Sequence, residues 1–184
     1  SYEKILVNKP DFAEAHYNLG VTLQELGQLD AALKSYEQAL AIKPDYAEVH
    51  NNLGITLKER GQLDDAVKSF EQALTIKPDY ADAHYNFGGT LEGLGQLDEA
   101  LTSYERAIVL KPDINFILGV LLHTKMHLCI WDDLPNRLDE LTKKINNGEK
   151  VAMPFPLLSL IDNPGIQRKT AEIYANNKHP QNHI

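Results

Sequence analysis

Apolar and polar positions along the chain repeat with a period of 34 residues. The clearest markers of the period are four prolines, Pro10, Pro44, Pro78 and Pro112. The segments that align in this way are 13–46, 47–80 and 81–114. A period of this length is typical of a helix–turn–helix unit. The pattern therefore predicts two helices per unit, over about 12–26 and 29–42, and again 34 and 68 residues further on.

Each unit carries the same series of small and large residues. In the first unit the series is Leu19, Gly20, Leu23, Gly27, Ala32, Tyr36, Ala39 and Pro44. Small residues are expected where two helices touch closely, and large apolar ones in the gaps between helices. The series resembles the tetratricopeptide repeat over residues 11–112, except at the first aromatic position, which holds His16, His50 and His84. The resemblance implies an all-α superhelix of stacked repeats, an α-solenoid, with a C-terminal helical cap or linker.

Charged residues and glycines predict where these helices begin and end. An aspartate after each proline suits the N-cap of a first helix, at Asp11, Asp45 and Asp79. The acid three residues later would lie in the first turn, where the helix dipole favours it, at Glu14, Glu48 and Asp82. The first helices should end at a left-handed glycine, at Gly27, Gly61 and Gly95. The second helices should end at the lysine before each proline, at Lys43, Lys77 and Lys111.

A different kind of helix is expected after the third repeat. Residues 113–130 are too apolar for a solvated helix and should be covered on most sides. Trp131 is expected to be buried, ahead of a helix with one apolar face made by Leu134, Leu138, Leu141 and Ile145. Two more helices should follow, a short apolar one over 157–161 and a last one from Asn163 to about Asn177.

These elements divide the chain into four expected parts. Residues 1–10 align with the second helix of a repeat whose first helix is missing, and residues 11–114 hold three repeats. Residues 115–147 form irregular capping helices, and residues 148–184 a helical linker toward a missing downstream domain. We expect further repeats upstream. The apolar face left open at that end favours some self-association.

Composition narrows the classes of partner. A formal net charge of −8 and a pI near 5.3 argue against nucleic acid and anionic membranes, which demand clustered Lys and Arg. The sequence shows neither an apolar run long enough to cross a bilayer nor a basic-then-apolar signal segment, so a cytoplasmic location is expected. The single cysteine, Cys129, excludes an internal disulfide. It is expected to be a buried, inert thiol, with a reactive role as the alternative.

Asparagine stands at the sixth position of each unit, at Asn18, Asn52 and Asn86. The first helices of such an array line its concave surface, so these side chains should form an evenly spaced row. Because a carboxamide carries both a donor and an acceptor, the row could hold the backbone of an extended peptide. The alternative is that the asparagines only brace neighbouring helices. The other groove residues would be Glu14, Tyr17, Val21, Gln24, Glu48, Asn51, Ile55, Lys58, Asp82, Tyr85, Gly89 and Glu92.

The sequence contains no recognisable catalytic or metal-binding constellation. The repeated histidines would lie one repeat apart, too far to share one metal ion, and are expected to be packing residues. His123 and His127 have the spacing of two ligands on one helix, but Thr124 stands where a zinc peptidase has its glutamate. The chain also lacks a Gly-rich phosphate loop and a nucleophile with a recognisable base. We therefore expect no metal, no cofactor and no catalytic activity in this chain.

The junction after the repeats carries a second resemblance. Cys-Ile-Trp-Asp-Asp-Leu at 129–134 and Pro-Phe-Pro-Leu-Leu-Ser-Leu at 154–160 look like the region that joins repeats to catalytic domain in the O-GlcNAc transferase family, of the Spindly-like bacterial type. The resemblance implies that the asparagine groove holds protein substrates and that a UDP-sugar-dependent glycosyltransferase domain follows Ile184. The leading hypothesis is therefore a substrate-recruiting arm. The alternative is a stand-alone scaffold that assembles other proteins with no attached enzyme.

Overall fold

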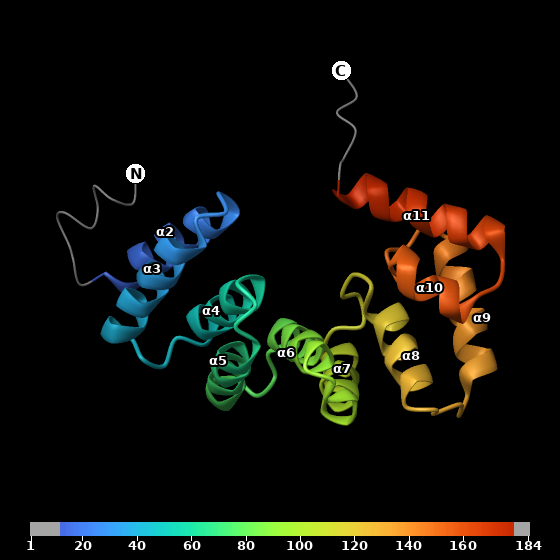
Figure 1. The fold of residues 1–184 in the computed structure, drawn as a ribbon, viewed down its shortest axis with the longest axis horizontal. Coiled ribbons are helices and arrows are strands. Elements are labelled where there is room, and N and C mark those ends of the chain that lie inside the picture. The colour runs from blue at the N-terminus through green and yellow to red at the C-terminus, as the bar shows by residue number, and fades with distance from the viewer. Residues whose placement is uncertain (1–11, 179–184) are drawn as a thin grey trace, which may run out of the picture. The chain divides into compact units, whose positions relative to one another are not determined.

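A computed structural model describes residues 12–178, and every regular element within this range is an α-helix (Figure 1). The helices are α2 (Ala13–Glu25), α3 (Leu29–Ile42), α4 (Ala47–Glu59), α5 (Leu63–Ile76), α6 (Ala81–Gly93), α7 (Leu97–Leu110), α8 (Ile117–His127), α9 (Leu134–Asn146), α10 (Pro154–Leu160) and α11 (Pro164–Lys178). The expected all-α fold is confirmed. The six helices of the repeats also lie close to the positions that the 34-residue period predicts.

The chain forms two compact units, residues 1–95 and residues 96–184. The boundary between them falls between α6 and α7, inside the third expected repeat. Residues 1–10, expected to be the second helix of a truncated repeat, lie outside the described part of the chain. The four-part division into truncated repeat, repeats, cap and linker stays a prediction.

The ends of the repeat helices follow three of the four rules predicted from the sequence. Three glycines at the ends of the first helices have left-handed backbone angles, with φ of 72° at Gly27, 77° at Gly61 and 76° at Gly95. Glycine adopts this conformation without steric cost, which explains its place there. The residues that end the second helices are Lys43, Lys77 and Lys111, as expected.

The aspartates, however, do not cap the first helices. The N-cap residues of α4 and α6 are Tyr46 and Tyr80, neither of which makes a side-chain capping bond. Asp45 and Asp79 stand one residue earlier, in the turn that follows each proline, so their expected role was wrong. The turn occupies one more residue than expected before the helix begins. Asp11 lies outside the described residues. The acids of the first turn are where the sequence predicts them, at Glu14, Glu48 and Asp82.

The core of the first unit joins glycines of the first helices to aromatic rings of the second. Tyr36 and Phe70 are fully buried. A Cβ atom placed on Gly20 would lie 2.5 Å from a ring carbon of Tyr36, and one on Gly54 would lie 2.8 Å from Phe70. No Cβ atom fits at such distances, so glycine is what allows the two helices of a repeat to approach. The expectation of small residues at helix contacts is therefore confirmed.

A lysine and a histidine hold the turn between consecutive repeats. Lys43 Nζ lies 4.6 Å from the ring centre of Tyr46, close enough for a cation–π interaction. The Nε2 atom of His50 is 2.9 Å from the carbonyl oxygen of Pro44. The same two contacts recur 34 residues later, with Lys77 over Tyr80 at 4.8 Å and His84 on Pro78 at 2.9 Å. These two histidines therefore pack against their own turn, as predicted.

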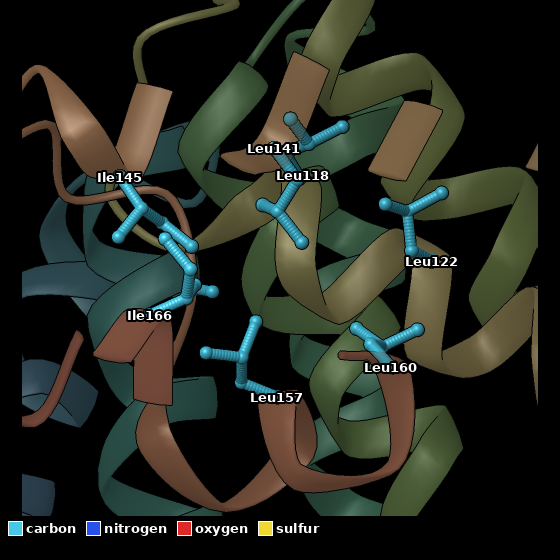
Figure 2. Close-up of a cluster of buried hydrophobic side chains, with 8 residues drawn as sticks. Leu118, Leu122, Leu141, Ile145, Leu157, Leu160 and Ile166 are labelled. Carbon is cyan, nitrogen blue, oxygen red and sulfur yellow. The ribbon is translucent and has the colours of Figure 1, made fainter. Parts of the chain in front are cut away.

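The second unit has its own hydrophobic core, shown in Figure 2. Four helices contribute buried aliphatic side chains that point into a common interior. The labelled members are Leu118 and Leu122 of α8, Leu141 and Ile145 of α9, Leu157 and Leu160 of α10, and Ile166 of α11. Leu134 and Leu138 pack against the edge of this core. The expected apolar face of the helix after Trp131 is therefore confirmed.

Helix α8 is covered on most sides, as its composition predicts, since residues 117–122 are all buried. Its N-terminus is capped by backbone from a distant loop rather than by a side chain. The N–H of Gly119 donates to the carbonyl of Val151 at 2.8 Å, and the N–H of Phe116 donates to the carbonyl of Lys150. A Cβ atom on Gly119 would lie 2.7 Å from Cβ of Ala152, so this close approach also requires glycine.

Two expectations about the junction were wrong. Cys129 is exposed rather than buried, because α8 ends at His127 and leaves the cysteine in a turn with φ of 57°. Trp131 is 54% exposed, because the apolar core of the unit is filled by aliphatic side chains from α8 to α11 without it. The short apolar helix begins three residues earlier than expected, at Pro154, and ends at Leu160, while the last helix lies within one residue of its expected bounds, at Pro164–Lys178.

Candidate functional site

The three first helices of the first unit, α2, α4 and α6, form one continuous surface, which we call the first-helix surface. Helix α4 contacts both α2 and α6. All residues expected in the groove lie on these helices. Most are half-buried, including Asn18, Asn52 and Asn86, whereas Asn51 is only 4% exposed. Glu14 and Asp82, at the start of their helices, are exposed.

A chain of side-chain hydrogen bonds crosses this surface. Nδ2 of Asn86 on α6 donates to Oδ1 of Asn51 on α4, at 3.2 Å. Nδ2 of Asn51 donates to Oδ1 of its neighbour Asn52, at 3.1 Å. Nδ2 of Asn52 donates in turn to the hydroxyl of Tyr17 on α2, at 3.2 Å. We call these four residues the amide chain. It shows that Asn52 and Asn86 do link neighbouring helices, which is the bracing role considered above.

Bracing leaves hydrogen-bonding capacity on the same side chains. A carboxamide has two N–H donors and an oxygen with two lone pairs. Asn52 uses one N–H and one lone pair in the amide chain and also makes a side-chain hydrogen bond with Tyr36, whereas Asn86 uses one N–H. Because both side chains are half-buried rather than buried, the other groups can face a ligand.

Each asparagine of the row is also held by its backbone. A threonine four residues later donates its hydroxyl to the asparagine carbonyl oxygen. The distances are 2.9 Å from Thr22 to Asn18, 2.8 Å from Thr56 to Asn52 and 2.9 Å from Thr90 to Asn86. Thr56 and Thr90 are fully buried, so this repeated bond satisfies a hydroxyl inside the protein.

Aromatic and polar groups surround the amide chain at the α2 end. The ring of Tyr17 lies 5.3 Å from that of Tyr46 and 6.3 Å from that of Tyr36, between ring centres. The Tyr36 hydroxyl donates to Oε1 of Gln24 at 2.9 Å. Between α4 and the turn before α6, Glu48 forms an ion pair with Lys77 at 3.3 Å. The α2 end of the surface is therefore already ordered by contacts within the protein.

Burial changes the proton affinity of several groups here. It raises the pKa of Tyr17, an effect that the hydrogen bond from Asn52 opposes. Burial, helped by the charge of Glu48, raises the pKa of Tyr80 to about 12. Burial lowers the pKa of Lys58, while the carboxylate of Glu92 acts in the opposite direction. Among the residues expected in the groove, Lys58 is the one base and stands against four acids, Glu14, Glu48, Asp82 and Glu92.

The His123 and His127 rings lie 4.3 Å apart between centres. Within residues 12–178, no group of three or more His, Cys, Asp and Glu is placed to hold a metal ion. No helix in the same range is long and apolar enough to cross a membrane. The cytoplasmic location stays a prediction.

The second unit has a cavity of about 510 Å³ that the sequence did not predict. Its lining includes aliphatic side chains such as Ile108 and Val151 and the ion pair between Lys144 and Glu149, at 3.1 Å. The remaining charged residues of the lining are Asp113, Glu140 and Lys150, so both signs of charge are present.

Sequence reasoning missed two parts of the first-helix surface. It assigned Asn51 to the groove wall, whereas the side chain is buried and joins the amide chain. It also overlooked Tyr46 and Tyr80, the aromatic residues just before α4 and α6. The signal for the tyrosines was present in the repeated sequence Lys-Pro-Asp-Tyr at 43–46 and 77–80.

The fold and this surface define a helical-repeat protein, an all-α solenoid whose first helices share one face. Family models confirm the kind of repeat. Two models, each described as tetratricopeptide repeat, match residues 11–79 and 57–115. Together they span residues 11–115, and this part of the chain therefore consists of tetratricopeptide repeats. No curated protein sequence matches the chain significantly.

Solved structures agree on the fold. The crystal structure of MamA matches with a TM-score of 0.72 and 23% identity, covering 79% of this chain and 85% of that one. MamA from Desulfovibrio magneticus RS-1, residues 41 to the end, matches with a TM-score of 0.71 and 18% identity, over 79% and 82%. The first repeat domain of Spaghetti (RPAP3), bound to the HSP90 peptide SRMEEVD, matches with a TM-score of 0.62 and 20% identity, over 64% and 93%. At such identities the likeness is one of fold.

Proposed function

We propose that the first-helix surface binds extended peptide segments of partner proteins. The observation that carries this proposal is the row of asparagines, in which the half-buried side chains keep further hydrogen-bonding capacity, a lone pair on the oxygen of Asn52 and an N–H and the oxygen of Asn86, beyond the bonds described above. A peptide backbone presents N–H and C=O groups at regular intervals, and a row of carboxamides can bind such groups whatever the side chains are. Tetratricopeptide repeats are protein-interaction modules, and the RPAP3 structure contains one with a bound peptide.

Charge favours one class of peptide. The groove residues include four acids, of which Glu48 is paired with Lys77, and one base, and the chain has a net charge of −8, so the surface attracts basic peptides and does not repel neutral ones. An acidic peptide such as SRMEEVD, bound by the RPAP3 domain, would be repelled here. We therefore expect ligand peptides that are extended, uncharged or basic, and defined more by backbone than by side chains.

The test is the joint replacement of Asn18, Asn52 and Asn86 by alanine. Wild-type protein is first used to select binders from a library of uncharged and basic peptides, and affinities are then measured by calorimetry. Each lost hydrogen bond costs about 0.5–1.5 kcal/mol, so the triple variant should bind at least about tenfold more weakly. A control in the second unit replaces exposed Asn146 and Asn176 by alanine and should bind like wild type.

The same variants separate peptide binding from bracing alone. Bracing alone predicts that the triple variant loses stability, measured by thermal unfolding, and still binds peptide normally once folded. Affinities are therefore compared at a temperature where circular dichroism shows every variant fully helical. Unchanged affinity at that temperature would refute the proposal.

Within this role, we propose that the chain recruits protein substrates for an O-GlcNAc-transferase-like glycosyltransferase. The support is the sequence resemblance at 129–134 and 154–160, and the comparisons with known proteins add nothing to it. The test is the coding sequence that continues past Ile184. A glycosyltransferase domain there would support the recruiting arm, and a different domain or a stop codon would refute it and favour the scaffold.

A further inference from the structure

The middle repeat differs from its neighbours at one buried position of the first-helix surface. The fifth position of each unit is Tyr17, Asn51 and Tyr85. The tyrosines are half-buried, whereas Asn51 is 4% exposed. A buried carboxamide must satisfy its donors and acceptor inside the protein. Its partners here are the two asparagines of the row on either side, Asn52 and Asn86.

Asn51 holds these two neighbours through opposite ends of its carboxamide. Its Oδ1 accepts from Nδ2 of Asn86, and its Nδ2 donates to Oδ1 of Asn52. The two groove amides therefore point the same way along the chain of bonds, each with its nitrogen on the side toward α2. If either one turned over, two oxygens or two nitrogens would face each other across a site with little water.

A tyrosine at this position could not impose such an order. A hydroxyl both donates and accepts, and its proton rotates to suit either partner. Tyr17, at the α2 end of the amide chain, shows this case, because its hydroxyl can meet either end of the Asn52 carboxamide. Within the amide chain, Asn51 is the residue that links the orientation of Asn52 to that of Asn86.

We propose that Asn51 is a positioning residue that keeps the Asn52 and Asn86 carboxamides in a common orientation, so that both address a bound peptide in the same chain direction. The inference rests on the proposed peptide-binding function. Along an extended peptide, N–H and C=O groups follow one another in an order that reverses when the peptide is turned around. If the two asparagine carboxamides share an orientation, both can bond a peptide that runs in one chain direction. If they are opposed, each favours a peptide that runs in a different direction.

Two substitutions at position 51 separate this role from general stability. Asn51→Asp keeps the size of the side chain but leaves acceptors only, so it draws the nitrogens of both Asn52 and Asn86 toward itself and opposes their orientations. Asn51→Leu removes both bonds and leaves the two amides free to turn independently. The expected order of peptide affinity is wild type, then Asn51→Leu, then Asn51→Asp.

The first measurement needs no ligand. Side-chain amide signals of Asn52 and Asn86 are compared by NMR in the wild-type chain and in Asn51→Asp. In Asn51→Asp, the Asn52 Nδ2 protons should shift downfield, because their hydrogen-bond acceptor changes from the Tyr17 hydroxyl to the new carboxylate. The Asn86 Nδ2 protons should stay hydrogen-bonded to position 51. An Asn52 signal that does not change would overturn the proposal, whether or not any peptide binds.

The second measurement uses one probe, an uncharged peptide from the selected library with capped ends, so that the charge added by the Asn51→Asp substitution has no ionic partner on the ligand. We expect Asn51→Asp to bind about 3–10 times more weakly than wild type, equivalent to one lost hydrogen bond. A spin label at either end of the peptide then reports its direction through broadened signals of α2 or α6. Wild type should show one direction and Asn51→Asp both.

The outcomes separate this inference from the proposed function. Normal binding by the triple alanine variant refutes peptide binding through the asparagine row. Weak binding by that variant, together with wild-type affinity and a single peptide direction in Asn51→Asp, leaves the function intact and overturns the role of Asn51. The role of Asn51 is also overturned if both position-51 variants lose peptide affinity in proportion to their loss of melting temperature and the bound peptide keeps a single direction.

Discussion

Replacing Gly54 by alanine should destabilise the first unit, although alanine is the better helix former. The added Cβ would lie 2.8 Å from two ring carbons of Phe70 and 3.0 Å from a third. Ordinary carbon contacts begin at about 3.5 Å, so the ring would have to move by roughly 0.7 Å. Phe70 is fully buried, so its ring moves at the expense of the side chains packed around it.

The expected change in the free energy of unfolding is the sum of two opposing effects. Overpacking of a well-filled core costs about 1–3 kcal/mol, and three close ring contacts place this site in the upper part of that range. Replacing glycine by alanine within a helix stabilises the helix by at most about 1 kcal/mol. We therefore expect a net loss of about 1–2 kcal/mol in the free energy of unfolding. For a chain of this size, each kcal/mol lowers the melting temperature by about 2–4 °C.

A second glycine provides the matched control. Gly93 also lies in a first helix, but its added Cβ would meet only Cδ1 of Leu63, at an ordinary 3.5 Å. Gly93→Ala should raise stability, by less than about 1 kcal/mol because the residue is the last of its helix. Both variants are measured by urea unfolding followed by circular dichroism. If Gly54→Ala proved as stable as wild type or Gly93→Ala, the contact with Phe70 would not limit the approach of α4 and α5.

Two further predictions concern the junction and the response to alkali. Trp131→Ala should lower the free energy of unfolding by no more than about 1 kcal/mol, because the side chain is 54% exposed. If thermal unfolding shows a loss of about 3 kcal/mol or more, the side chain is buried after all. Tyr80 has its pKa raised from 10.0 to about 12, so the unfolded chain loses this proton first and stability falls as pH rises from 10 to about 12. Tyr80→Phe should show a shallower fall in urea titrations across that range, and an equal slope would contradict the raised pKa.

The repeat helices could be read from the sequence because their signals are local and occur three times. Left-handed Gly27 and the lysine before Pro44 each depend on a few neighbouring residues, and the period confirms them in the next unit. The aspartate caps failed because Asp45 and the true N-cap, Tyr46, are adjacent. A shift of one residue in the turn is beyond what propensity can resolve.

The structure of the second unit was harder to predict from the sequence, since the positions of its helices and buried residues depend on contacts between distant segments. An apolar helix over residues 117–122 could be recognised as buried, yet nothing local showed that Val151 and Lys150 would cap it. Trp131 and Cys129 were expected inside because their types are usually buried. The aliphatic core of α8 to α11 closes without them, which only the packing reveals.

The candidate site shows the same limit. The period alone identified Asn18, Asn52 and Asn86, because a repeated residue type is visible in one sequence. Asn51 breaks the period, so it counted as variation in the groove wall. Its importance comes from burial and from bonds to both neighbours, which depend on how α4 packs against α6.

The contacts that join consecutive repeats have a practical consequence for protein engineering. Lys43 on Tyr46 and His50 on Pro44 all fall within eight consecutive residues, and the same holds for Lys77 to His84. Each connector is thus encoded in one short stretch of sequence. Blocks of 34 residues can be duplicated, exchanged or deleted when the cuts fall at equivalent points within α3 and α5, because every connector then moves intact with its block.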